Sequence, residues 1–338
     1  MIVFPKTIDE ALAALQAHPG AELRAGGTDL QDRRHLQLHA AHQDVELGPI
    51  VDLRDVPGLD LIAAEGQQAW IGGLATLQSI ADHPAISGLW PGVAQACGAL
   101  ANPQIRAVAT IAGNLMQGPR CWYYRHPDYR CLRKGGDTCY AREGEHPWHV
   151  CFDSSPCAAP HASTVAMALA AYDAEVELVA APGAAPRRLP VLEALATDDP
   201  GPGGLITAVF LPAPWALERS AYVRASNRSR AEWALVEVSV RLVLDDDDRI
   251  TAAAVAAGAV APKPLRLQAV EQALVGQRAR PKTLAEAAAL ASRGAKPLPQ
   301  TAYKPGLLEG TVLTALERAL TAPITPTSIT IDPAGATP

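Results

Sequence analysis

The sequence predicts an α+β protein of two domains, and three observations lead to this prediction. The chain has 338 residues, which is more than one small core organises. Strand and helix patterns mix up to about residue 215. From about residue 220 strand patterns come first and helix patterns follow. We therefore expect domains over 1–215 and 220–322, and a flexible tail over 323–338, where Pro, Thr and Ala dominate.

Composition limits the classes of protein that fit. Hydrophobic residues make up 49% of the chain and charged residues 19%, the balance of an ordinary globular protein. A net charge of −6 does not attract nucleic acid or an anionic membrane. No apolar run approaches the roughly 20 residues that span a bilayer, and the N-terminus lacks the features of an export signal. The sequence therefore predicts a cytoplasmic protein without nucleic-acid binding or membrane insertion.

The first domain is expected to begin with a helix after Thr7, because Thr7-Ile-Asp-Glu10 fits a capping box and the helical spacing lasts until Pro19-Gly20. Apolar periodicity predicts the following elements, and accumulated Pro and Gly predict loops. The expected strands are Glu22–Arg24, Ile50–Leu53, Ala69–Ile71 and Glu175–Val179, the expected helices are Leu77–Ala81, Gly92–Leu100 and Val165–Ala171, and the expected loops are Ala180–Arg188 and Asp198–Gly204.

The second domain is predicted to be a sheet covered by helices. Alternating apolar residues indicate strands, Asp245–Asp248 supplies a charged turn, and three amphipathic segments indicate helices. The expected strands are Ala221–Ala225, Leu235–Leu244 and Ile250–Ala257, and the expected helices are Leu265–Leu274, Thr283–Ser292 and Leu307–Leu320.

A segment over 117–160 is predicted to be an insertion, because it has no sustained helix or strand period and is dense in Cys, aromatic and basic residues. Five of the six cysteines lie there, and a local thiol cluster in a large chain favours a metal site over a disulfide framework. They are Cys121, Cys131, Cys139, Cys151 and Cys157.

The spacing of these cysteines favours an iron–sulfur cluster over a zinc ion. Zinc ribbons usually bring closely spaced Cys-x-x-Cys pairs, and no such pair occurs here. A cubane presents four separate iron corners, which suits widely spaced thiolates from a wrapping loop. Zinc and unliganded thiols remain alternatives. Six nearby cations are candidates to offset a cluster's negative charge: Arg120, Arg125, Arg130, Arg133, Lys134 and Arg142.

Two loops have the composition of a backbone nest for phosphate oxygens. Ala25-Gly26-Gly27-Thr28-Asp29 follows a predicted strand, and a second segment contains Thr110, Gly113 and Asn114. An ordinary tight turn is the alternative for the first loop. Neither loop is a Gly-x-Gly-x-x-Gly or P-loop motif. His35, His39 and His42 are spaced along one helix face without an acidic partner, so we expect them on the solvated surface.

These residues resemble the FAD-binding subunits of the xanthine dehydrogenase family of molybdenum hydroxylases. Ala-Gly-Gly-Thr-Asp-Leu at 25–30 and Ala-Thr-Ile-Ala-Gly-Asn-Leu at 109–115 are similar to the two flavin-pyrophosphate loops of that family, and Tyr222-Val-Arg224 is similar to the start of its C-terminal domain. The resemblance implies a two-subdomain PCMH-type FAD-binding domain and a CO-dehydrogenase-flavoprotein-like domain of antiparallel sheet and helices. The implied FAD contacts are Ala25, Gly26, Gly27, Thr28, Asp29, Leu30, Ala101, Thr110, Gly113, Asn114, Ser163, Thr164 and Arg224.

The insertion is similar to that of 4-hydroxybenzoyl-CoA reductase β subunits and periplasmic aromatic-aldehyde oxidoreductase flavoproteins, which implies a [4Fe-4S] cluster. Cys151 has apolar neighbours, whereas Cys157 follows a turn-forming stretch, and the resemblance also favours Cys157 as the fourth ligand. We therefore expect the ligands to be Cys121, Cys131, Cys139 and Cys157, with Cys151 free. This sequence departs from the family pattern at two positions: Ala112 stands where Gly is usual, and Thr164 stands where Asp is usual.

The resemblance implies an electron-transfer subunit. A molybdenum-cofactor large subunit would carry the substrate chemistry, a [2Fe-2S] small subunit would connect it to the FAD, and an external acceptor or donor would complete the path. A twin-arginine signal on a partner is a route by which such an assembly reaches the periplasm. Two alternatives remain: a stand-alone PCMH-type flavin oxidase, and a zinc-stabilised binding module without catalysis.

Overall fold

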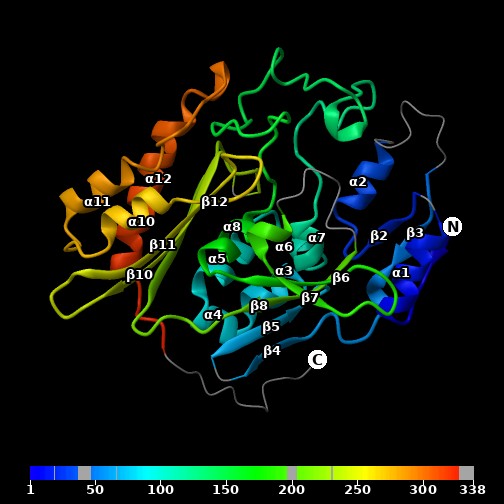
Figure 1. The fold of residues 1–338 in the computed structure, drawn as a ribbon, viewed down its shortest axis with the longest axis horizontal. Coiled ribbons are helices and arrows are strands. Elements are labelled where there is room, and N and C mark those ends of the chain that lie inside the picture. The colour runs from blue at the N-terminus through cyan, green and yellow to red at the C-terminus, as the bar shows by residue number, and fades with distance from the viewer. Residues whose placement is uncertain (19, 37–46, 66, 196–203, 230, 327–338) are drawn as a thin grey trace.

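The computed structural model describes residues 1–18, 20–36, 47–65, 67–195, 204–229 and 231–326. Figure 1 shows three sheets with helices packed between and around them. The α+β class predicted from the sequence is confirmed. Within the described residues, none of the helices combines the length and apolarity needed to cross a membrane.

The N-terminal sheet is small and parallel, with strand order β1-β3-β2. The Thr7 side chain caps the first helix as expected, since it accepts a hydrogen bond from Glu10 N at 3.1 Å. The other half of the expected capping box differs, because the Glu10 carboxylate accepts from Lys6 N at 2.7 Å, one residue before the N-cap. Ala11 and Leu12 of that helix are buried in one core cluster with Val51. The elements are β1 (Ile2–Val3), α1 (Ile8–Ala17), β2 (Glu22–Arg24), α2 (Leu30–His35), β3 (Ile50–Asp52) and η1 (Leu53–Asp55).

The second sheet has five antiparallel strands in the order β4-β5-β8-β6-β7. Its strands are β4 (Ile62–Glu65), β5 (Gln68–Gly72), β6 (Glu175–Val179), β7 (Arg187–Pro190) and β8 (Leu205–Leu211). The accompanying helices are α3 (Leu77–Asp82), α4 (Pro84–Leu89), α5 (Pro91–Ala99), α6 (Pro103–Arg106), α7 (Ile111–Leu115), α8 (Thr164–Ala171) and α9 (Val191–Ala194). Every residue of α8 is buried, which its apolar sequence allows.

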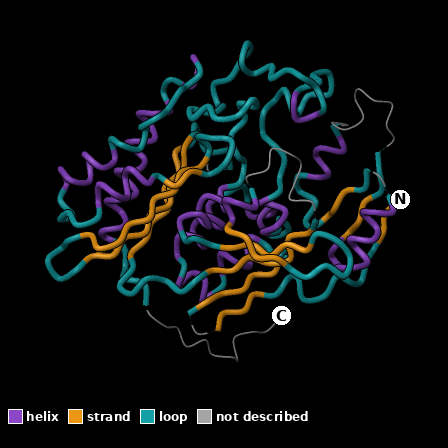
Figure 2. The backbone as a smooth tube through the Cα atoms, viewed as in Figure 1, coloured by secondary structure: helices purple, strands orange, loops and turns teal. Residues whose placement is uncertain are grey.

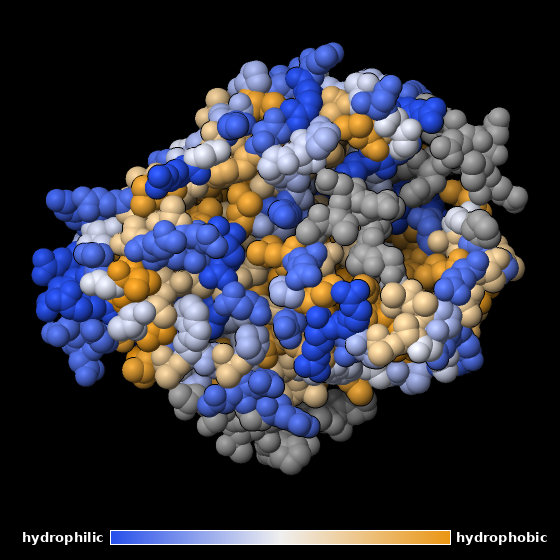
Figure 3. All heavy atoms as spheres, in the orientation of Figure 1, coloured by the Kyte–Doolittle hydropathy of each residue, from blue (hydrophilic) through white to orange (hydrophobic). Residues whose placement is uncertain are grey.

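The third sheet is antiparallel with order β12-β11-β10-β9. Helices α10 and α12 cover one face, while α5 and α8 lie on the other, so this sheet is sandwiched between two helical layers (Figure 1). Hydrophilic side chains gather at its free end, where residues 245–249 are exposed (Figure 3). The elements are β9 (Arg219–Ala225), β10 (Val236–Leu244), β11 (Ile250–Gly258), β12 (Leu265–Arg266), α10 (Gln268–Leu274), α11 (Pro281–Ala288), η3 (Pro299–Thr301) and α12 (Lys304–Thr321).

Several expected bounds require correction. The helix expected over Leu265–Leu274 begins only at Gln268, because Leu265 and Arg266 pair with Ala257 and Ala256 as β12. The loop expected over Ala180–Arg188 ends in β7, which pairs with β6. Most of the loop expected over Asp198–Gly204, most of the tail over 323–338, and His39 and His42 lie outside the described residues.

The chain between α7 and α8 contains the cysteines and is almost entirely loop, as the long teal segment of Figure 2 shows. Its one regular element in the described chain is the short 3-10 helix η2 (Leu132–Lys134). The two ends of this segment are joined, because Gln117 Nε2 donates to Asn114 O at 3.0 Å and to Ala162 O at 3.2 Å. The segment therefore leaves and re-enters the fold at the same place. We call residues 117–162 the cysteine insertion.

Candidate functional site

The first nest-like loop, residues 25–30, follows β2 directly and packs against the second loop. A Cβ placed on Gly26 would lie 1.8 Å from Val108 O, so only glycine permits this approach. Gly27 has φ +75°, a conformation that other residues rarely adopt. Thr28 is exposed and Leu30 is buried. The loop thus presents a glycine backbone next to the segment that leads into α7.

The second loop caps α7. The Thr110 side chain accepts a hydrogen bond from Gly113 N at 3.3 Å. A Cβ on Gly113 would stand 2.9 Å from Thr110 Oγ1 and 4.0 Å from the Cβ of Ala25, so small residues of the two loops face each other. The two segments that the sequence singles out are therefore adjacent, although residues 31–108 lie between them along the chain.

Two further candidates for FAD contacts, Ser163 and Thr164, lie at the start of α8. Ser163 Oγ donates to Asn114 Oδ1 at 2.6 Å and accepts from Ala166 N, so Ser163 both caps α8 and fixes the second loop. Thr164 is buried and its side chain hydrogen-bonds within the group of Tyr222 and Glu237. Burial raises the pKa of Glu237, and the Tyr222 hydroxyl donates to it at 3.0 Å.

Arg224 and Ala101 lie at the junction between the second and third sheets. Arg224 Nη1 donates to Ala99 O at 3.0 Å, two residues before Ala101. Ala101 has φ +50°, which is unusual for a residue other than glycine. Arg106 Nη1 donates to the carbonyls of Leu100 and Ala101 and holds this turn in place.

Asp29 connects the first loop to the cysteine insertion. Its carboxylate accepts from Arg33 Nε at 3.0 Å, from Gly118 N at 2.9 Å and from Arg125 Nη2 at 2.5 Å, and pairs with Arg120 at 2.9 Å. Burial alone would raise the pKa of Asp29, but the guanidinium groups of Arg120 and Arg125 outweigh it and the pKa lies below the ordinary value. Asp29 is therefore ionised and fully engaged by the protein.

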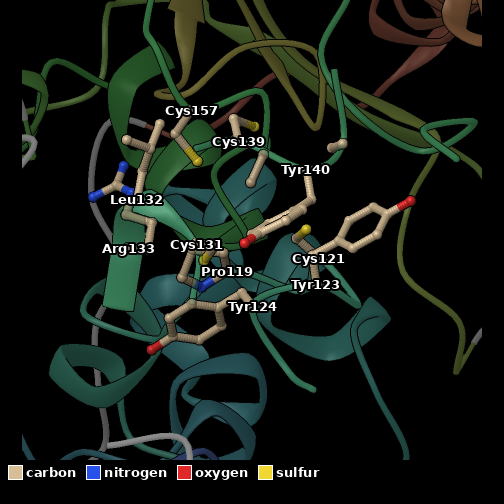
Figure 4. A pocket seen from close by; sticks show the side chains of 12 residues that line it. Pro119, Cys121, Tyr123, Tyr124, Cys131, Leu132, Arg133, Cys139, Tyr140 and Cys157 are labelled. Carbon is tan, nitrogen blue, oxygen red and sulfur yellow. The ribbon is translucent and has the colours of Figure 1, made fainter. Parts of the chain in front are cut away.

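Four of the insertion's cysteines line one pocket, shown in Figure 4 with their sulfurs directed into the same region. These are Cys121, Cys131, Cys139 and Cys157. Cys151 is fully buried elsewhere, in the core formed by β9, β10, β11 and helices α10 to α12. Its backbone N–H donates to Val260 O at 2.9 Å, which fixes the residue in that core.

Backbone N–H groups donate toward the sulfur of each of the four pocket cysteines. Burial raises the pKa of Cys121 to about 11, and the donors oppose it. The Cys157 thiol donates to the sulfur of Cys139 and lowers the pKa of Cys139 to about 5, so these two lie side by side. The backbone donors are Tyr123 and Tyr124 at Cys121, Arg133 and Lys134 at Cys131, Ala141 and Ala158 at Cys139, and Ala159 at Cys157.

The surroundings of the pocket are basic and aromatic. Arg133 hydrogen-bonds to Cys157, Lys134 lies beside Cys131, and Arg142 lies beside Cys139. Arg120 and Arg125 form ion pairs with Asp29 instead, and Arg130 is exposed. The aromatic rings pack on one another edge to face around the pocket: Trp122, Tyr123, Tyr129, Tyr140 and Trp148.

The sequence reasoning did not single out His149 as a site residue. Its Nε2 lies 3.2 Å from Cys121 Sγ, and burial lowers the pKa of His149 to about 4. Its position among aromatic residues, two before Cys151, gives no signal for a contact with a cysteine 28 residues earlier. His35, which was expected on the surface, is exposed at the end of α2.

The four pocket cysteines have the ligand chemistry that an iron–sulfur cluster requires. Within the described residues, no group of three or more His, Cys, Asp or Glu side chains converges closely enough to hold a single metal ion. A cubane binds one thiolate at each of four separated irons, so its ligands need not converge on a point. Hydrogen bonds to cluster sulfurs are also usual in such sites, and the N–H donors around this pocket have that chemistry.

Comparisons with known proteins agree with this arrangement. Residues 1–214 match the family model described as the FAD binding domain in molybdopterin dehydrogenase, and residues 221–319 match the CO dehydrogenase flavoprotein C-terminal domain. The aldehyde oxidoreductase FAD-binding subunit PaoB of Escherichia coli (strain K12) is 32% identical over 281 residues, which is 78% of this chain and 82% of that protein.

Two solved structures have the same fold. Carbon monoxide dehydrogenase from Hydrogenophaga pseudoflava aligns with a TM-score of 0.73 at 21% identity, covering 95% of this chain and 96% of that chain. Quinoline 2-oxidoreductase from Pseudomonas putida 86 aligns with a TM-score of 0.73 at 19% identity, covering 95% and 96% respectively. At these identities the likeness concerns the fold.

The fold and the two domain matches define a flavoprotein component of an oxidoreductase. The chain belongs to the family of FAD-binding subunits of the xanthine dehydrogenase and CO dehydrogenase type, within the molybdenum hydroxylases. The resemblance inferred from the sequence is thereby confirmed, and FAD is the cofactor of its family domain.

Proposed function

We propose that this chain is an electron-transfer subunit that binds FAD and one [4Fe-4S] cluster. The observation that carries the proposal is the shared pocket of Cys121, Cys131, Cys139 and Cys157, in which backbone N–H groups donate toward every sulfur. When bound, FAD supplies two-electron and one-electron redox chemistry, and the cluster supplies one-electron transfer.

The residues of the two glycine loops would hold the flavin. Gly26, Gly27 and Gly113 allow close backbone approach to phosphate oxygens, and Thr28 offers an exposed hydroxyl beside them. Ser163 and Asn114 fix the second loop, while Asp29 ties the first loop to the cysteine insertion. The hydrogen bond between Asp29 and Arg125 supports the proposal that this chain holds the two cofactors at a constant distance.

The partners in the proposal are a molybdenum-cofactor large subunit, a [2Fe-2S] small subunit and an external electron acceptor or donor. An aldehyde, aromatic or N-heterocyclic substrate would be oxidised, or an aryl-CoA reduced, on the large subunit. The similarity to a subunit of an aldehyde oxidoreductase favours an aldehyde. We also propose the division into domains over 1–215 and 220–322 with a tail over 323–338, and a cytoplasmic location unless a partner's signal exports the assembly.

Metal analysis and visible spectroscopy of the natively expressed protein test the proposal. We expect FAD together with iron and acid-labile sulfide, copurification with molybdenum and [2Fe-2S] subunits, and a paramagnetic signal from the reduced cluster. Flavin without iron in a monomer would support a stand-alone flavin oxidase instead. Zinc without flavin or iron would support a binding module.

A further inference from the structure

The imidazole of His149 is packed against the cysteine pocket and is only 3% exposed. Its Nε2 lies 3.2 Å from the Sγ of Cys121. The indole of Trp122 packs edge-on against the ring, with 6.0 Å between the centroids. Besides its backbone donors, the sulfur of Cys121 therefore meets one buried side-chain nitrogen.

The backbone around His149 is held by the C-terminal helices. Lys304 Nζ, at the start of α12, donates to Trp148 O at 3.2 Å, and Thr301 Oγ1 of η3 donates to Val150 O at 2.9 Å. Both donors are fully buried. The backbone on either side of His149 is therefore fixed from outside the insertion.

The hydrogen-bond inventory of the ring indicates which nitrogen carries the hydrogen. Nδ1 of His149 is buried and makes no well-formed hydrogen bond among the described residues, although the backbone of His146 lies close enough to the ring for a weak one. An N–H at Nδ1 would be a buried donor without a well-placed acceptor, which is rarer and more costly than an unpaired lone pair. The hydrogen is therefore favoured on Nε2, from which it points at sulfur. A thiolate accepts this hydrogen bond better than a thiol does, and the thiolate is the form in which cysteine binds a metal.

We propose that His149 is a positioning residue that donates its Nε2–H to the Sγ of Cys121 and thereby raises the reduction potential of the iron–sulfur cluster. The inference rests on the proposed function, since it requires Cys121 to be a cluster ligand. A reduced cluster carries one more negative charge, which its ligand sulfurs share. A donor at sulfur is therefore bound more strongly in the reduced form, and hydrogen bonds to charged groups are the stronger class.

Redox titration of the whole assembly, followed by the paramagnetic signal of the reduced cluster, tests the inference. His149→Leu removes the donor with little change in volume. We expect its iron and sulfide content to match wild type and its midpoint potential to fall by about 59 mV, the equivalent of a tenfold change for a one-electron couple. His149→Gln keeps an N–H donor of similar reach and is expected to recover most of the loss.

His126→Leu is the matched control, because His126 lies in the same insertion with its side chain 53% exposed, and its potential is expected to equal that of wild type. An unchanged potential in a cluster-loaded His149→Leu protein would overturn the inference. So would equal potentials in the Leu and Gln variants that both differ from wild type. A wild-type protein without iron and sulfide would instead refute the proposed function, so the two failures are distinguishable.

A second measurement applies if His149→Leu does not retain the cluster. The wild-type protein is produced with ¹⁵N-labelled histidine, reduced, and measured by pulsed electron paramagnetic resonance. We expect a coupling between the cluster's unpaired electron and a ¹⁵N nucleus, and we expect this coupling to be absent in His149→Gln. The absence of such a coupling in wild type would overturn the inference without any need for the Leu variant.

Discussion

Arg125, in the cysteine insertion, donates a hydrogen bond from Nη2 to Oδ1 of Asp29, at the end of the first glycine loop, at 2.5 Å. The same carboxylate accepts from Gly118 N and pairs with Arg120, so three residues of the insertion bind one residue of the loop. Asp29 has a side chain only 13% exposed, which places this connection largely out of water. These bonds hold the loop proposed for FAD against the insertion proposed for the cluster.

Asp29→Asn is expected to lower the free energy of unfolding by about 2–3 kcal/mol, because the neutral amide removes the carboxylate that pairs with Arg120 and leaves Arg125 with Asp32 as its remaining ion-pair partner. Denaturant titration measures the loss. Asp128→Asn is the control in the same insertion, since that side chain is 84% exposed, and its effect should stay within about 0.5 kcal/mol. Equal effects of the two substitutions would refute the role given to Asp29.

The contribution of Asp29 should depend on pH. The pKa of Asp29 in the folded protein lies below the ordinary value of 3.8, so the ionised carboxylate stabilises the folded state at every pH above the unfolded pKa. The stability difference between wild type and Asp29→Asn should therefore be constant above about pH 5. It should shrink as the pH falls below about 4 toward the folded pKa. A difference that grows on acidification would contradict this assignment.

Gly26→Ala is expected to reduce FAD occupancy by about tenfold or more, because the new Cβ would meet Val108 O and push the two glycine loops apart. Flavin absorbance per protein chain is the measurement. Gly310→Ala in α12 is the control, since a Cβ there meets nothing within 4 Å and alanine should stabilise that helix by up to about 1 kcal/mol. Full flavin occupancy in Gly26→Ala would exclude this loop from the flavin site.

Arg241→Met is expected to destabilise the protein by about 3–5 kcal/mol, because it leaves Glu218 buried without its ion pair. The Arg241 guanidinium lies between the rings of Tyr172 and Trp215, at 4.4 and 3.9 Å from their centroids, and joins β10 to the end of α8. Thermal or denaturant unfolding measures the loss.

The double variant Arg241→Met with Glu218→Gln should lose less stability than Arg241→Met alone, since no unpaired buried charge remains. Arg249→Met, at an exposed position in the turn before β11, should stay near wild type. If the double variant were less stable than the single one, the penalty would not come from the buried carboxylate of Glu218.

Local signals in the sequence predicted local structure well. The N-cap at Thr7 and the strand at Glu175–Val179 form with the expected residues, because neighbours along the chain determine them. The predicted start of α10 was wrong, because pairing of Leu265 with Ala257 overrides the helical spacing of the apolar residues. Only tertiary structure selects such a pairing, and apolar periodicity alone gives no information about it.

The same distinction applies to the candidate site. The sequence singled out the two glycine loops by composition, but it could not show that Gly26 is the glycine with least space, since the obstructing carbonyl of Val108 lies 82 residues later. The contact between His149 and Cys121 was missed for the same reason. Thr164, expected beside the flavin by resemblance, is buried with Tyr222 and Glu237, whose positions depend on how β9 packs against α5 and β10 against α8.

The two cysteines nearest the end of the insertion should respond differently to substitution. Cys157→Ser is expected to lose most of the cluster's iron and its reduced-state paramagnetic signal, because Cys157 lines the pocket with Cys121, Cys131 and Cys139. Cys151→Ser should keep both, since Cys151 lies in the core beside β10 and β11 and acts there as a small hydrophobe. The Cys151→Ser substitution should instead lower the stability of the protein by about 1–3 kcal/mol, because it buries a hydroxyl in an apolar site.

Iron and sulfide analysis, the paramagnetic signal and denaturant unfolding of both variants separate the two roles. Iron loss in Cys151→Ser with an intact cluster in Cys157→Ser would make Cys151 the fourth ligand and would require the end of the insertion to turn inward, away from Val260.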